Sequence, residues 1–64
     1  MNKLENEMNR VMQRWIVDLR GDENGNWSVR VDDGSEYGGE LVATVYGLAL
    51  AEIIVAEHNT LRAR

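Results

Sequence analysis

The chain contains no cysteine, no proline and no phenylalanine among its 64 residues. Without cysteine there is no disulfide framework, and no group of His or acidic residues has the spacing of a structural zinc site. A chain of this length buries only about 60% of its unfolded surface, which leaves a marginal core. We therefore expect one domain over residues 1–64 that gains further support from a second copy, as a homo-oligomer.

Long apolar runs are missing as well. The N-terminal segment MNKLENEMNRVMQRW has no apolar stretch of the secretion-signal type, and no run approaches the roughly 18 residues of a membrane span. The formal net charge is −4, whereas binding to duplex nucleic acid requires Lys or Arg side chains clustered on one face for phosphate contacts. We expect a soluble, cytoplasmic protein that binds neither membranes nor duplex nucleic acid directly.

Two patterns divide the first half of the chain. Residues 2–13 carry apolar side chains at helical spacing, which predicts a short amphipathic helix. From Arg14 to Arg20, and again from Trp27 to Val31, apolar and polar residues alternate, which predicts two strands. The GDENGN segment between them is rich in turn formers, so we expect a hairpin. One register places the large apolar side chains on a common face and predicts three pairs: Leu19 with Trp27, Val17 with Val29 and Trp15 with Val31.

The second half changes from a two-residue period to a helical one. The segment DDGSEYGG has three glycines and no regular period, which predicts a loop. Residues 40–46 then alternate as a third strand, Gly47 ends it, and a helix follows over residues 48–62. One long helix over residues 38–64 is the alternative, but Gly47 and the β-branched residues of VATV argue against it. The predicted fold class is α+β, with a short N-terminal helix and a three-stranded antiparallel β-meander packed by a C-terminal helix.

The C-terminal helix has more apolar surface than one small sheet can cover. Its predicted core-facing sector comprises Leu50, Ile54 and Leu61, flanked by Ala51, Ile53 and His58. The third strand is expected to add Leu41, Ala43 and Val45 to the core. Leu48 and Val55 point away from the helical sector, and Ile16 and Val42 lie on the sheet face opposite the core. We expect these four residues to form the oligomer interface.

Several short motifs follow one another from Trp27 to Leu61. Their order is Trp-x-Val, a Gly-containing loop, Val-Ala-x-Val, and Ala-x-x-Ile-Ile-x-Ala-x-His-Asn-x-Leu, carried by Trp27, Val29, residues 42–45 and residues 51–61. This order resembles small uncharacterised proteins encoded by tailed phages and prophages, although the Pro-Gly-Pro often found before their Trp is missing. The resemblance covers somewhat over half the chain. It implies an accessory protein of the host-cell cytoplasm, in a class where counter-defence and host-modulating factors are common.

The best candidate for a ligand site is the sheet face opposite the core. Arg20 and Arg30 project there from neighbouring strands, beside Tyr46. The planar guanidinium group suits phosphate or carboxylate, and a tyrosine ring can stack on a base. An anionic, nucleotide-type ligand is therefore one expectation. The alternative is that both arginines pair with Asp18 and Asp32 on a solvated face.

His58 is the remaining candidate, as a nucleotide contact or a general base. No Ser or Cys nucleophile stands at a recognisable spacing from it, and a histidine in this position is more often a partly buried residue or a partner of the helix C-terminus. The acidic clusters at residues 22–24 and 32–33 lack EF-hand spacing, and the Gly-containing loops match no phosphate-binding motif. We expect no metal site, no cofactor and no enzymatic activity.

Binding is the function that these features favour. We expect a homo-oligomer that either sequesters a small nucleotide-type ligand, through Arg20, Arg30, Tyr46 and His58, or blocks the surface of a host protein. Two alternatives stay open. The first is an acidic protein-binding inhibitor that imitates the charge of nucleic acid, although the acidic residues form no continuous stripe. The second is a small hydrolase that uses His58.

Overall fold

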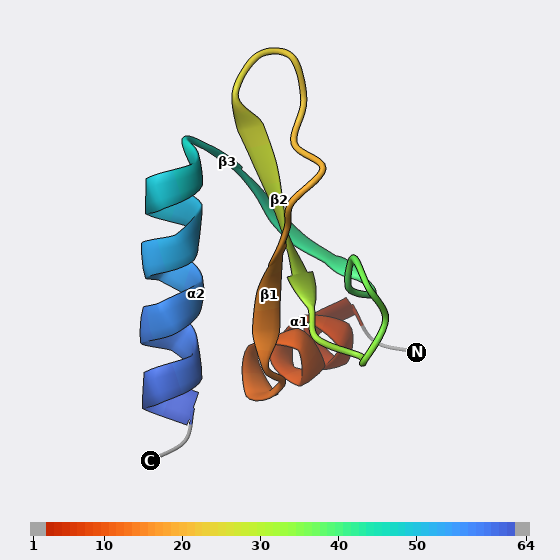
Figure 1. The fold of residues 1–64 in the computed structure, drawn as a ribbon. Coiled ribbons are helices and arrows are strands. Elements are labelled where there is room, and N and C mark those ends of the chain that lie inside the picture. Colours follow the sequence, from red (N-terminus) through yellow and green to blue (C-terminus); the bar gives the residue numbers. More distant parts are fainter. Residues whose placement is uncertain (1–2, 63–64) are drawn as a thin grey trace.

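A computed structural model describes residues 3–62 of the chain. Its elements, in order, are α1 (Lys3–Met12), β1 (Trp15–Asp18), β2 (Asn26–Val31), β3 (Leu41–Tyr46) and α2 (Leu48–Arg62). The strands form one antiparallel sheet in the order β1-β2-β3, with α2 alongside it and α1 at the end where β1 begins (Figure 1). The predicted α+β fold is confirmed, and residue 2, where the first helix was expected to begin, lies outside the described residues.

The β1–β2 hairpin has the predicted register but is shorter than expected. Two of the three predicted pairs form, Val17 with Val29 and Trp15 with Val31. The third pair, Leu19 with Trp27, does not form, because β1 ends at Asp18. The carboxylate of Asp18 accepts the backbone N–H of Arg20 at 3.0 Å, an Asx turn that draws the chain out of the ladder. As a result Leu19 is exposed.

The core between the sheet and α2 is small. Val29, at the centre of β2, and Ala51, on α2, are completely buried, and Val31 is nearly so. The third strand contributes less than predicted. A bulge at Val29/Arg30 sets Arg30 opposite Leu41, and Leu41 is exposed instead of joining the core. Ala43, opposite Val29, is exposed as well, whereas Val45 on the same face is half-buried, so α2 leaves the first part of β3 uncovered.

Helix α2 presents a different side to the sheet from the one predicted. Ala51 is buried, and Leu48 and Val55, which lie at helical spacing from it, are half-buried. Ile54 is half-buried too, but Leu50 and Leu61 are exposed, so the predicted core-facing sector was wrong at these two residues. The correction has a physical reason: apolar side chains occur on almost every side of this helix, so hydrophobic spacing leaves its rotation undetermined. Leu48 and Val55, assigned to the oligomer surface, are partly covered within a single copy.

The loop between β2 and β3 folds back over the sheet face that α2 leaves free. Gly38 has a φ of +88°, and a Cβ atom there would lie 2.8 Å from Cβ of Arg30 and 3.1 Å from Cδ1 of Ile16. Glycine alone combines this backbone conformation with so close an approach. Ile16, also assigned to the oligomer surface, is therefore half-buried beneath the loop.

Candidate functional site

One buried carboxylate organises the sheet face that carries both predicted ligand-binding arginines. Asp18 is only 4% exposed. The Nε atom of Arg20 donates a hydrogen bond to its Oδ1 at 2.9 Å, and the Nε atom of Arg30 donates to its Oδ2 at 3.2 Å. Arg30 also donates through a terminal nitrogen to the carbonyl of Gly39 at 3.1 Å. The structure thus brings Arg20 and Arg30 together, but around an internal partner.

The electrostatics of this cluster reinforce the pairing. Hydrogen bonding from Arg20 holds the pKa of Asp18 far below its ordinary value, against the opposing effect of burial, and Arg30 adds a smaller contribution in the same direction. The Asp18 carboxylate in turn raises the pKa of Arg20. An external anion would have to compete with this buried carboxylate for both guanidinium groups.

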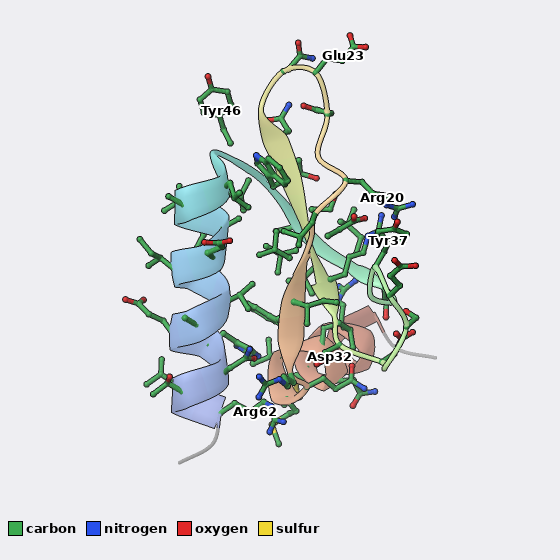
Figure 2. The ribbon with its side chains drawn as sticks, in the orientation of Figure 1. Arg20, Glu23, Asp32, Tyr37, Tyr46 and Arg62 are labelled. Carbon is green, nitrogen blue, oxygen red and sulfur yellow. The ribbon has the colours of Figure 1, made fainter. Side chains whose placement is uncertain are left out.

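Tyr46 does not join the arginine cluster. It is 74% exposed and lies opposite Asn26, whereas Arg30, at the other end of β2, lies opposite Leu41. Figure 2 shows Tyr46 well apart from Arg20 and Tyr37. The aromatic ring beside the cluster is that of Tyr37, whose centroid lies 4.2 Å from Cζ of Arg20 in a cation–π contact. Sequence reasoning missed Tyr37, because it lies in a loop without a regular period.

His58 belongs to a different cluster, where α2 meets the segment between α1 and β1. Its ring stacks on the ring of Trp15, with centroids 3.4 Å apart and planes inclined by 5°. Its Nε2 lies 2.6 Å from the carbonyl oxygen of Gln13 and donates to it, since a carbonyl can only accept. The indole Nε1 of Trp15 donates to the carbonyl of Arg10 at 2.7 Å. These contacts fasten the end of α1 against α2.

Asn59, the neighbour of His58, closes part of the outer edge of β1. Its carboxamide accepts the backbone N–H of Trp15 at 2.9 Å and donates to the carbonyl of Trp15 at 2.9 Å. An adjacent antiparallel strand would make the same two contacts. Sequence reasoning did not find this role, because an asparagine near the end of a helix has no pattern that indicates a strand partner.

The acidic clusters support turns in the chain. Asp22 accepts the backbone N–H groups of Asn24 and Asn26, and Asp33 accepts the backbone N–H and the hydroxyl of Ser35. Hydrogen bonds from Asn26 lower the pKa of Asp22, and those from Ser35 lower the pKa of Asp33. Within residues 3–62, no group of three His or acidic side chains is arranged to hold a metal ion.

A hollow of about 540 Å³ lies between α1 and the C-terminal end of α2. We call it the α1–α2 hollow; it is lined by Val11, Met12, His58, Leu61 and Arg62. Its three apolar residues are largely exposed, Met12 to 73%. The hollow combines an apolar floor with a cationic side chain, Arg62, and so differs in chemistry from the ion-paired cluster around Asp18.

Known proteins give no assignment for these sites. Comparison of the chain with protein-family models, with curated proteins and with solved structures found no match. Within the part of the chain that the structure describes, no helix has the length and apolar character needed to cross a membrane. The function therefore has to be inferred from the contacts themselves.

Proposed function

We propose that this chain is a non-catalytic binding protein that blocks the surface of a partner protein through the α1–α2 hollow. The observation that supports this most strongly is the group of large apolar side chains exposed in the hollow, Val11, Met12 and Leu61, with the exposed Met8 one helical turn before Met12. Contiguous exposed apolar surface of this kind marks interaction sites in soluble proteins. Methionine side chains are flexible and polarisable, so they adapt to an apolar partner.

Blocking a protein surface is better supported than sequestering a nucleotide. Arg20 and Arg30 both bind Asp18, and Tyr46 lies at the other end of β2. A phosphate that drew the arginines away would leave a buried carboxylate unpaired, which is strongly unfavourable. The residues described as lining the α1–α2 hollow include no carboxylate. Its apolar lining beside Arg62 suits an apolar side chain next to an acidic group of a partner protein.

The proposal includes action as a homo-oligomer, which the small size of the chain favours, in the cytoplasm of a host cell, which the resemblance to phage accessory proteins implies. The chain exposes 4743 Å² of surface, whereas a folded monomer of 7.3 kDa is expected to expose about 4,200 Å². Two copies that each buried this excess would remove roughly 1,100 Å² from water, and a specific interface needs about 1,000 Å². The excess surface therefore favours self-association.

Site-specific crosslinking in a bacterial host tests the protein-binding role. The photoreactive residue p-benzoylphenylalanine replaces Met12 in one variant and Glu23, at the tip of the β1–β2 turn (Figure 2), in a control. We expect the probe at position 12 to capture one partner protein, and a further Leu61→Asp substitution to abolish that capture. Equal capture from both positions, or capture that survives Leu61→Asp, would contradict the role of the hollow.

A thermal-shift screen tests the ligand-binding alternative separately. A ligand that binds the native state and is present at 100 times its dissociation constant stabilises that state by about 2.7 kcal/mol. We expect no shift from nucleotides, cyclic dinucleotides or ADP-ribose derivatives. A shift that disappears in the Arg20→Ala variant would instead favour sequestration of a nucleotide-type ligand at the Asp18 cluster.

A further inference from the structure

The two edges of the sheet differ in how they are covered. At the β1 edge, Asn59 already occupies the backbone groups of Trp15. Within residues 3–62 the β3 edge has no neighbouring strand, since the order is β1-β2-β3. Ala43 and Thr44 point to opposite faces of β3, and both are exposed. The described structure therefore leaves β3 open along its edge and, at these positions, on both faces.

The hydrogen-bonding pattern shows which groups of β3 point outward. The backbone N–H of Asp32 donates to the carbonyl of Arg14, so the even-numbered residues of β2 bond to the β1 side. The odd-numbered residues of β2 therefore bond to β3, where Val29 meets Ala43 and Trp27 meets Val45. By alternation, the N–H and C=O groups of Thr44 and Tyr46 point away from β2, along the open edge.

The sequence of β3 lacks the residue types that usually prevent an edge strand from pairing with another strand. Its sequence, LVATVY, contains no charge, no proline and no glycine. Soluble proteins commonly protect an exposed edge with Lys, Pro, a bulge or a covering element. Here the bulge lies at Val42, which stands between Leu41 and Ala43 without a partner on β2, so it interrupts the edge there and leaves residues 43–46 regular. A segment rich in β-branched residues with an open edge is well suited to pair with another strand.

We propose that β3 pairs with β3 of a second copy, antiparallel about a twofold axis at Thr44. This inference rests on the homo-oligomer part of the proposed function and specifies its interface. In this register Thr44 faces the partner's Thr44 on the regular part of the strand, and Tyr46 faces the partner's Val42 at the bulge. The outward backbone groups of Thr44 and Tyr46 then gain hydrogen-bond partners, and the two sheets become one.

The position of α2 agrees with this pairing. Its Glu52 and Asn59 lie on the flank beside β1, where they line a groove with that strand. Leu50 and Ile54 lie on the opposite flank by helical spacing, which is the β3 side because β2 separates the two edges. Pairing through β3 brings these flanks of the two helices toward each other. The exposed side chain of Leu50 thereby moves into a less hydrated environment.

A charge exchange at the twofold axis tests the proposal. Only a residue on the axis faces its own copy, so Thr44→Lys alone sets like charges opposite each other, as does Thr44→Glu alone. An equal mixture of the two variants sets Lys opposite Glu. Thr44 is exposed, so both substitutions are compatible with the monomer fold. Thr60→Lys, at an exposed position of α2, is the control.

Sedimentation equilibrium at micromolar concentration provides the measurement. We expect a dimer for the native chain and for Thr60→Lys, monomers for the two Thr44 variants alone, and a dimer for their mixture. Recovery in the mixture also shows that both variants are folded. A native chain that stays monomeric would overturn this inference and the homo-oligomer proposal together. A native oligomer that persists in Thr44→Lys, or a mixture that stays monomeric, would overturn the β3 interface alone.

Discussion

The side chain of Asn59 takes the place of a neighbouring strand at Trp15, because its carboxamide both accepts from the N–H and donates to the C=O of that residue. The contact joins α2 to β1 across 44 positions of sequence. Few apolar side chains of the described residues are completely buried. These two hydrogen bonds therefore contribute strongly to the orientation of the helix on the sheet.

Asn59→Leu is expected to destabilise the fold by about 1–3 kcal/mol, because both backbone groups of Trp15 lose their partner in a partly buried place. Urea denaturation measures the change. Thr60→Ala is the control, since the Thr60 hydroxyl bonds only within α2, to the carbonyl of Ala56. Equal stability of the two variants would show that the hydrogen bonds between Asn59 and Trp15 do not hold the helix on the sheet.

Asp18→Asn is expected to reduce stability at pH 7 and to weaken its dependence on acid. The pKa of Asp18 is lower in the folded than in the unfolded state. Its contribution is therefore present above the ordinary carboxyl pKa of about 4 and is lost as the pH falls from there toward the folded value. Urea midpoints between pH 2 and pH 7 test this, with Glu57→Gln on the exposed side of α2 as control. Parallel acid profiles for native protein and Asp18→Asn would contradict it.

Gly38→Ala is expected to be more destabilising than Gly34→Ala. Both glycines have positive φ, +88° and +89°, so each substitution carries a similar backbone strain. Only at Gly38 does the added Cβ also meet neighbours, with Arg30 Cβ at 2.8 Å, whereas nothing lies within 4 Å at Gly34. Thermal unfolding of the two variants isolates the steric part. A similar loss in both would mean that the loop does not pack on the sheet.

Ala51→Leu is expected to cost about 1–3 kcal/mol, because the larger side chain overfills a completely buried position. Ala49→Leu, two positions earlier on an exposed side of α2, is expected to be nearly neutral. Chemical denaturation of both variants tests the rotation of the helix. If the Ala49 variant were the less stable one, the helix would face the sheet on another side.

The strand pairs were predictable because alternation and a self-consistent hairpin register both act over short distances. Val17 with Val29 illustrates this. The rotation of α2 was not predictable, since apolar residues surround it and the contact that accompanies its orientation, Asn59 with Trp15, is polar and distant in sequence. The ion pairs were only partly predictable. Asp18 was one of two expected partners for the arginines, but the other, Asp32, pairs with Arg14 instead.

The candidate ligand site was predicted only from the sheet face that each residue occupies. This explains why the structure brings Arg20 and Arg30 together but leaves Tyr46 apart. Arg20 and Arg30 do meet at Asp18, although Arg20 lies beyond the end of β1, but a shared face does not say how far apart residues lie along a strand. Tyr46 therefore lies far from them, and Tyr37, from an irregular loop, lies beside Arg20. The predicted oligomer interface of Ile16, Val42, Leu48 and Val55 remains a prediction, and all four residues are half-buried within one copy.

Amide hydrogen exchange at Thr44 and Tyr46 tests the central claim, self-association through β3, most directly. Their N–H groups point along the open edge in one copy and pair with a strand in the proposed dimer. We expect their exchange to slow as protein concentration rises, approaching that of Ala43 and Val45, which bond to β2. If the protein associates while Thr44 and Tyr46 exchange at the same fast rate at every concentration, β3 is not the interface.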